Sequence, residues 1–229
     1  MREFVHTYPY LVFCLVGLGL LGGLLMHCPG QRKPALWSGL LCVPFGLSGA
    51  WLVPVYWDPR LVWSIGRVGV EDLLFCFVTG GLVWLFSAWW WRDHLAVEIQ
   101  MRFVSGAYAA LLVLGLLCFG TAWLILRDPM AAVWMAFGNG TAVFLLLRPG
   151  SWRLAVAGAA GFGLYYGLST MAWIWLVPEF ADSWPAAGRW NAPVGGVPQG
   201  EIVWAVTFGA CWPSWMAYLF RAEVMKEST

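Results

Sequence analysis

Seven apolar runs, separated by short polar segments, dominate the hydrophobic pattern of the chain. Each run is about 20 residues long, the length that an α-helix needs to cross the hydrocarbon core of a bilayer. The first run is too long for the apolar core of a signal peptide and no small-residue cleavage site follows it, so we expect it to remain as a helix. The pattern predicts an all-α integral membrane protein with seven transmembrane helices. The runs are residues 8–27, 35–56, 71–91, 103–126, 129–147, 153–177 and 201–221.

The composition agrees with a membrane protein. Hydrophobic residues make up 61% of the chain and charged residues 11%, whereas soluble domains carry about a quarter charged residues. The net charge of +1 provides no basic surface for nucleic acid. The six cysteines form no C-x-x-C motif, the three histidines are far apart, and no G-x-G-x-x-G fingerprint is present. We therefore expect no metal site and no bound cofactor.

The second part of the chain repeats the first. The segment FGLSGAWLVP (45–54) returns as YGLSTMAWIWLVP (166–178), each time in the second helix of a group of three. A long connection rich in Trp, Pro and Gly follows each copy, and a carboxylate stands at the start of the next helix. Aligning Asp72 with Glu201 matches four further pairs, namely Gly66 with Gly195, Val68 with Val197, Phe75 with Trp204, and Gly80 with Gly209.

This repeat predicts three parts: a first three-helix repeat over residues 1–91, a linking helix within 92–128, and a second three-helix repeat over 129–229. Because one linking helix crosses the membrane once, both repeats run in the same direction. The two carboxylate sites then face the same side of the membrane. Duplicated membrane units often place their binding site at the interface between the repeats.

Lysine and arginine in the connections predict the orientation, because cytoplasmic loops carry an excess of them. The lysines and arginines fall into a group of eight on one side of the membrane and a group of five on the other. Placing the larger group in the cytoplasm predicts a cytoplasmic C-terminus and an external N-terminus in a multi-pass protein of the cell (inner) membrane. One side carries Arg32, Lys33, Arg92, Arg102, Arg148, Arg153, Arg221 and Lys226, and the other carries Arg2, Arg60, Arg67, Arg127 and Arg189.

Glu71, Asp72 and Glu201 are the candidate catalytic residues, since each stands at a predicted helix start. We expect Glu71 and Asp72 to form the acid–base pair, with Glu201 as the partner acid. Acids at helix starts are also ordinary caps, favoured by the helix dipole by about 0.3–1 kcal/mol. A carboxyl group shielded by apolar walls is more readily protonated and can protonate an alkene. Aromatic faces can then stabilise a carbocation.

Aromatic residues follow the acids at helical spacing and are the candidate substrate contacts. Aromatic residues in the long connections are also typical of a membrane interface. The candidates on the helices are Phe75, Trp204, Phe208 and Trp212, and those in the connections are Trp63 and Trp190.

Two short motifs, GVED (69–72) and PQGE (198–201), open the last helix of each repeat. With seven helices in two three-helix units, they resemble the P-x-E-E-like motifs of the lycopene cyclase domain family, the integral-membrane carotenoid cyclases. Glu71 and Asp72 match the two acids of the first motif, although Gly69 replaces the family's proline. Glu201 matches the second acid of the second motif, and Gly200 stands in place of the first.

The resemblance implies a membrane enzyme that closes a ring at the end of a carotenoid such as lycopene. Protonation of the terminal double bond gives a cation, the 5,6 double bond attacks it, and loss of a proton completes the ring without net redox change. A polyisoprenoid would enter from the membrane lipid between the repeats, and a partner subunit fits the two-subunit members of this family.

Two other functions compete with the cyclase. The degenerate PQGE motif also fits a non-catalytic, carotenoid- or isoprenoid-binding membrane subunit with a cyclase-like fold. A retinal-binding photoreceptor would need a mid-helix lysine, and a proton-coupled transporter would need ionisable groups at mid-depth; the sequence offers neither.

Two G-x-x-x-G pairs, Gly19/Gly23 and Gly163/Gly167, fit either internal helix packing or formation of an oligomer.

Overall fold

The computed structural model describes residues 2–185, 190 and 192–225. Within this part of the chain, seven helical segments are long and apolar enough to cross a membrane, which confirms the predicted seven-helix membrane fold. These segments are Pro9–His27, Pro29–Leu52, Val70–Trp91, Met101–Leu126, Pro129–Leu147, Pro149–Leu176 and Gln199–Leu219. Two residues used for the orientation, Arg189 and Lys226, lie outside the described residues, as does the side chain of Arg2.

The long helices and the strands follow one another in the same order in both halves of the chain. The first half contains α1 (Arg2–Thr7), α2 (Pro9–His27), η1 (Pro29–Gln31), α3 (Arg32–Cys42), η2 (Val43–Ser48), α4 (Gly49–Leu52), β1 (Ser64–Ile65), β2 (Val68–Gly69), α5 (Val70–Ala88), η3 (Trp89–Trp91) and β3 (Leu95–Ala96). After α6 (Met101–Leu126), the second half contains α7 (Pro129–Leu147), η4 (Pro149–Ser151), α8 (Trp152–Leu176), η5 (Pro178–Ser183), β4 (Pro193–Val194), β5 (Val197–Pro198), α9 (Gln199–Leu219) and β6 (Glu223–Val224).

The two β-hairpins show the repeat most clearly. Ser64 pairs with Gly69 in the first hairpin, and Pro193 pairs with Pro198 in the second, at the same offset that aligns Asp72 with Glu201. Both turns place a glycine in the left-handed region, Gly66 with φ 64° and Gly195 with φ 61°. Glycine adopts this conformation without steric penalty. Each hairpin leads directly into the third long helix of its repeat, so it fixes where the acids begin.

The second helix differs between the two repeats. In the second repeat, α8 is one continuous helix, whereas in the first repeat α3 ends at Cys42 and continues as the 3₁₀ segment η2. Pro44 lies at the start of this segment and has no N–H to continue the α-helical pattern. The tighter segment brings Gly46 so close to α5 that a Cβ there would lie 2.9 Å from the Asp72 backbone oxygen.

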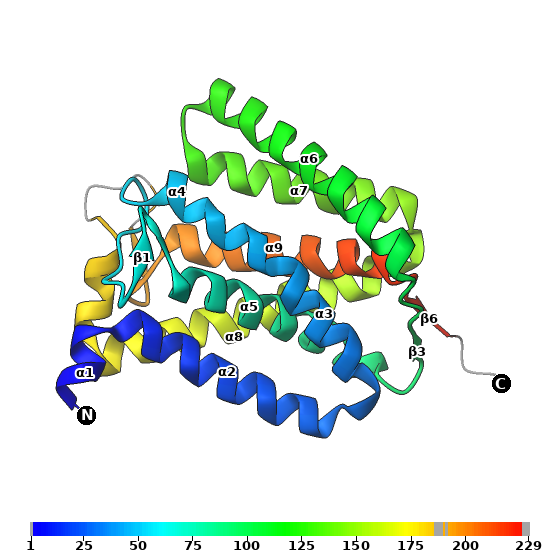
Figure 1. Cartoon of the computed structure of the whole chain (residues 1–229), viewed down its shortest axis with the longest axis horizontal. Coiled ribbons are helices and arrows are strands. Elements are labelled where there is room, and N and C mark those ends of the chain that lie inside the picture. The colour runs from blue at the N-terminus through cyan, green and yellow to red at the C-terminus, as the bar shows by residue number, and fades with distance from the viewer. Residues whose placement is uncertain (1, 186–189, 191, 226–229) are drawn as a thin grey trace.

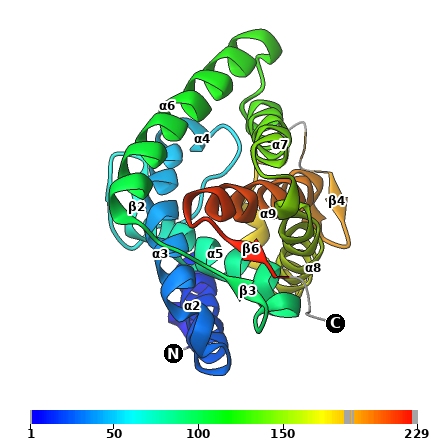
Figure 2. The ribbon, with the colours of Figure 1, turned by 90° about the vertical axis from the view of Figure 1, so that its right-hand side faces the viewer.

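The third helices, α5 and α9, form the centre of the bundle (Figures 1 and 2). Each crosses the second helix of its own repeat at a glycine. A Cβ at Gly80 would lie 2.8 Å from the Ser38 carbonyl oxygen, and a Cβ at Gly209 would lie 2.6 Å from the Gly158 carbonyl oxygen. Gly163 similarly packs against Val206, so one G-x-x-x-G pair takes part in internal helix packing.

Both hairpins lie at the end of the bundle that carries the N-terminus (Figure 1). At the opposite end, β3 pairs with β6, which joins the chain after α5 to the chain after α9. The linking helix α6 lies at the edge of the bundle, and none of its membrane-spanning window is buried. The acids at the starts of α5 and α9 therefore belong to the same end of the molecule.

Candidate functional site

Asp72 is held by the hairpin that precedes it. Its Oδ2 accepts a hydrogen bond from the Gly69 backbone N–H at 2.7 Å, three residues earlier. Its Oδ1 accepts a second hydrogen bond from the Tyr10 hydroxyl at 3.1 Å, across from α2. The residue is 7% exposed. These two donors fix the carboxyl group at the start of α5, where the helix dipole also favours an acid.

Glu201 is held by aromatic donors. Its Oε2 accepts a hydrogen bond from the Tyr166 hydroxyl of α8 at 2.6 Å, and its Oε1 accepts one from the Trp184 indole N–H at 3.2 Å. The Tyr56 hydroxyl lies beside this carboxyl, is shielded from solvent and makes no well-formed hydrogen bond to any described residue. Burial, together with the adjacent Glu201 carboxyl, raises the pKa of Tyr56 well above its ordinary value. Tyr56 is therefore a neutral phenol next to Glu201.

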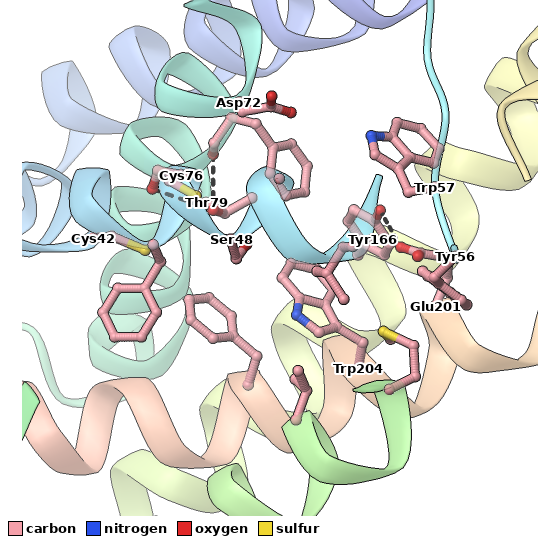
Figure 3. A pocket seen from close by; sticks show the side chains of 18 of the residues that line it. Cys42, Ser48, Tyr56, Trp57, Asp72, Cys76, Thr79, Tyr166, Glu201 and Trp204 are labelled. Atoms are coloured by element: carbon pink, nitrogen blue, oxygen red, sulfur yellow. Dashed lines mark hydrogen bonds between the residues drawn. The ribbon is translucent and has the colours of Figure 1, made fainter. Parts of the chain in front are cut away.

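Asp72 and Glu201 line one cavity of about 170 Å³. Figure 3 shows the cavity with Glu201 next to Tyr166 and with Asp72 on another part of the wall. Between the two helices, Phe75 and Trp204 face one another with their ring centroids 5.7 Å apart. These two rings are equivalent positions of the repeat, so the cavity lies where the two repeats meet. The sequence predicts paired sites, and the structure combines their acids in one cavity.

The predicted aromatic contacts divide into two groups. Phe75, Trp204 and Phe208 line the cavity, and the Trp204 and Phe208 rings stack at 5.2 Å. The other three predicted contacts, Trp212, Trp63 and Trp190, lie outside the cavity lining. Trp212 is a core residue that donates a hydrogen bond to the Ser38 hydroxyl at 2.9 Å. Trp63 is 59% exposed, and Trp190 donates to Asp128 at 2.7 Å.

Glu71 lies outside the cavity lining as well, although it precedes Asp72 in the chain. Its side chain is completely buried, and its Oε1 accepts a hydrogen bond from the Val62 backbone N–H at 2.6 Å. Its Oε2 has no hydrogen-bond partner among the described residues. One residue corresponds to about 100° around a helix, so Glu71 points toward the connection before the hairpin. The structure therefore gives Glu71 the position of an anchor for this connection.

Gly200 is the counterpart of Glu71 in the second repeat. A Cβ at Gly200 would lie 2.5 Å from the Tyr56 hydroxyl oxygen and 3.1 Å from two ring carbons of Tyr56. A side chain at position 200 would therefore displace Tyr56. The missing acid of the PQGE motif leaves space for a tyrosine from the first repeat.

The two long connections contact each other above the cavity. The Asp58 backbone N–H donates to the Ser183 carbonyl oxygen at 2.7 Å, and the Trp57 and Trp184 rings lie 4.5 Å apart. Arg67 donates to the Val53 carbonyl oxygen at 3.0 Å, so this hydrogen bond links the beginning of the first connection to its end. Trp57 also belongs to the cavity lining, whereas Trp184 reaches Glu201. The connections therefore form part of the site.

A polar contact attaches the N-terminal helix to the second connection. His6 Nδ1 lies 3.0 Å from Glu179 Oε2, and this hydrogen bond lowers the pKa of Glu179. A carboxyl group with a lowered pKa stabilises the folded state above its ordinary pKa, and this contribution is lost as the pH falls through the folded-state value. Both side chains are at the surface, where such pairs contribute little to the stability of the folded state.

The tyrosines and Trp184 carry no signal in the sequence that would assign them to the site. Tyr10 and Tyr166 belong to α2 and α8, and their hydroxyls reach the acids only after the helices pack. Among the described residues, no group of three or more His, Cys, Asp or Glu side chains is placed to hold a metal ion. The polar groups of the cavity wall include the two carboxyls and the tyrosine hydroxyls.

Comparison of the chain with protein-family models, curated proteins and solved structures gives no match. The function is therefore inferred from the site itself. Its chemical content is two buried carboxyl groups, each hydrogen-bonded to a tyrosine, facing an aromatic cavity inside a membrane bundle.

Substitution Tyr166→Phe is expected to reduce any proton-transfer activity of the site by about tenfold without unfolding the protein. The variant removes one hydrogen bond to Glu201, of the kind that contributes about 1.5–3 kcal/mol when one partner is charged. It keeps the ring, which contacts Trp204 at 5.2 Å. Turnover should be compared with that of Tyr165→Phe, whose hydroxyl makes no hydrogen bond to either acid. Equal turnover in the two variants would contradict a role for the Tyr166 hydroxyl.

Proposed function

We propose that the chain is a membrane enzyme that closes a ring at one end of a linear polyene by acid–base chemistry. Asp72 and Glu201 are the acid–base pair, and a lycopene-type carotenoid is the substrate. The observation that carries the proposal is the convergence of two buried carboxyl groups, one from each repeat, on a single aromatic cavity. The resemblance of GVED and PQGE to the motifs of membrane carotenoid cyclases supports the same chemistry.

The reaction needs one proton to enter and one to leave. A carboxyl group protonates the terminal double bond, and the resulting tertiary cation is attacked by the 5,6 double bond, which forms the carbon–carbon bond of the ring. A carboxylate then removes a proton next to the new cationic centre and restores a double bond. Substrate and product are isomers, so no electron acceptor or donor takes part. Asp72 and Glu201 hold these protons at Oδ and Oε atoms that face the cavity.

The surroundings of the acids support this chemistry. Burial disfavours a charged carboxylate, so a proton is retained more easily and is delivered to a weak base such as an alkene. Phe75, Trp204 and Phe208 provide ring faces whose quadrupoles attract a cation. Glu71, which the sequence includes among the catalytic residues, has no place in this mechanism because it does not line the cavity.

The test is pigment analysis of lycopene-accumulating bacterial cells that express the chain. Monocyclic or bicyclic carotenoid is expected in the presence of the wild-type protein. The double variant Asp72→Asn/Glu201→Gln, expressed at the same level in the membrane, is expected to leave lycopene unchanged. Lycopene retained by the purified protein without any ring product would favour the alternative, a non-catalytic carotenoid-binding subunit.

The proposed orientation places the N-terminus and the acid site on the external side and the C-terminus in the cytoplasm. Eight Lys and Arg residues against five support this orientation. A green fluorescent protein fused to the C-terminus is expected to fluoresce in bacterial cells, whereas alkaline phosphatase at the same position is expected to be inactive. The reverse pattern would contradict the orientation and would leave the proposed chemistry intact.

A further inference from the structure

A second cavity, of about 280 Å³, adjoins the cavity that holds the acids. The two share part of their walls, including Phe45, Leu52 and Phe137. Phe45 and Leu52 come from the interrupted second helix of the first repeat, and Phe137 comes from α7. The two cavities are therefore separated by shared side chains of three elements rather than by a layer of the bundle.

The linking helix α6 forms one wall of the second cavity, which it lines with residues that include Leu112, Gly115 and Phe119. It contributes nothing to the lining of the acid cavity. The lining of the second cavity is almost entirely apolar, with Ser48 and Asn139 as its uncharged polar side chains and no carboxyl group. The two cavities thus differ in chemistry: the first contains carboxyl groups, and the second is apolar and contains none.

The second cavity opens on the lipid-facing surface. Leu47, Trp51, Leu114 and Val143 belong to its lining and are between 41% and 53% exposed. These residues lie on membrane-spanning segments, so their exposed surface faces acyl chains. A hydrocarbon can therefore reach this cavity without crossing water.

We propose that this second cavity is the lateral entrance for the substrate and holds the unreacted part of the polyene while its end lies between Asp72 and Glu201. The inference rests on the proposed function and specifies how its substrate binds. The occupant is a linear isoprenoid hydrocarbon, because an apolar cavity that opens to lipid adjoins the cavity that holds the acids, with only shared side chains between the two. The entrance lies between the first repeat, α6 and α7, so the linking helix is part of the substrate site.

One consequence follows for the reaction. A single acid cavity within the described residues, entered from one side, receives one end of the polyene at a time. The other end remains toward the lipid. A substrate with two reactive ends must leave and return in the opposite direction for its second ring, so a monocyclic product is expected to appear first.

Gly115 provides a direct test. A Cβ at this position meets no atom within 4 Å, and the residue lines the second cavity. Gly115→Trp should therefore fill the entrance while leaving helix packing intact. Gly106→Trp is the matched control, because Gly106 lies on the same helix, also has no atom within 4 Å of its Cβ, and lines neither cavity.

Both substitutions are introduced into the wild-type protein and into the Asp72→Asn/Glu201→Gln variant. The amount of lycopene retained per purified protein is measured in the Asp72→Asn/Glu201→Gln background. Ring formation is measured in the wild-type background. We expect Gly115→Trp to lower both by about tenfold, and Gly106→Trp to change neither. If the two tryptophan variants retain equal amounts of lycopene and form rings at equal rates, the proposal that the second cavity is the entrance is wrong.

The outcomes separate the entrance from the chemistry. If the protein retains lycopene, Gly115→Trp abolishes this retention and the wild type forms no ring, the result would support the entrance and contradict the cyclase. Ring formation by the wild type and equally by Gly115→Trp would support the cyclase and contradict the entrance. Failure of every protein to retain lycopene or to form rings would overturn both.

Discussion

Asp72→Asn and Glu201→Gln are each expected to reduce ring formation by about 100-fold or more. General acid–base catalysis by a positioned side chain contributes roughly 10²–10⁴-fold, and an amide can neither deliver nor accept the proton. Both substitutions preserve the shape of the side chain. The Gly69 N–H can still donate to the amide oxygen introduced at position 72, and the Trp184 indole can still donate to the one introduced at position 201. The measurement is the rate of cyclic carotenoid formation per folded protein in membrane vesicles.

Glu71→Gln is the matched control for these variants. The Val62 N–H can still donate to the remaining amide oxygen, and the second atom has no partner to lose among the described residues. Ring formation by Glu71→Gln is therefore expected to stay within about threefold of the wild type. Loss of turnover in Glu71→Gln with normal turnover in Glu201→Gln would contradict the assignment of the acid–base pair.

Gly209→Ala is expected to destabilise the protein by about 1–3 kcal/mol, the range observed when a well-packed core is overfilled. The new Cβ would lie 2.6 Å from the Gly158 carbonyl oxygen and 3.1 Å from the Ala159 Cα. Both contacts involve backbone, which cannot rotate away. The helices α8 and α9 would have to separate, and α9 would carry Glu201 with it. The measurement is the midpoint of thermal unfolding in detergent.

Gly167→Ala is the control for this effect. Gly167 lies on α8, the helix against which Gly209 packs, but its Cβ would meet no atom within 4 Å. Alanine is favoured over glycine inside a helix by about 0.5–1 kcal/mol, so this variant should be as stable as the wild type or slightly more stable. Equal midpoints for Gly209→Ala and the wild type would contradict the close packing of α8 against α9.

The fold could be predicted from the sequence because hydropathy reports membrane spans directly. All seven predicted runs correspond to helical segments long enough to cross a membrane. The run 35–56 is the least regular, since it is divided into α3, η2 and α4 at Pro44. The prediction of a single helix there overlooked the missing N–H of this proline.

Part of the site could also be predicted from the sequence repeat. The alignment of Asp72 with Glu201 also places the two hairpins in register, with Gly66 and Gly195 in the same left-handed conformation. Because these hairpins fix the starts of α5 and α9, the sequence could indicate that both acids belong to one end of the bundle. It also identified Phe75 and Trp204, which meet across the repeats.

The rest of the site depends on rotation and packing, which a single sequence does not report. Glu71 and Asp72 are neighbours in the chain, yet one faces a connection and the other faces the cavity. Tyr10 and Tyr166 come from different helices of their repeats and have no shared motif. Trp212 follows Phe208 at helical spacing, but its indole is directed toward Ser38 in the core.

The most direct measurement of the central claim is cyclisation by the purified protein in lycopene-containing vesicles prepared in D₂O without added cofactors. The acid–base mechanism takes one proton from an exchangeable carboxyl group for each ring and releases one from carbon. Mass spectrometry is therefore expected to show cyclic product that carries one deuterium per ring, and Asp72→Asn/Glu201→Gln is expected to form none. Absence of cyclic product, or cyclic product without deuterium, would contradict proton-initiated ring closure by Asp72 and Glu201.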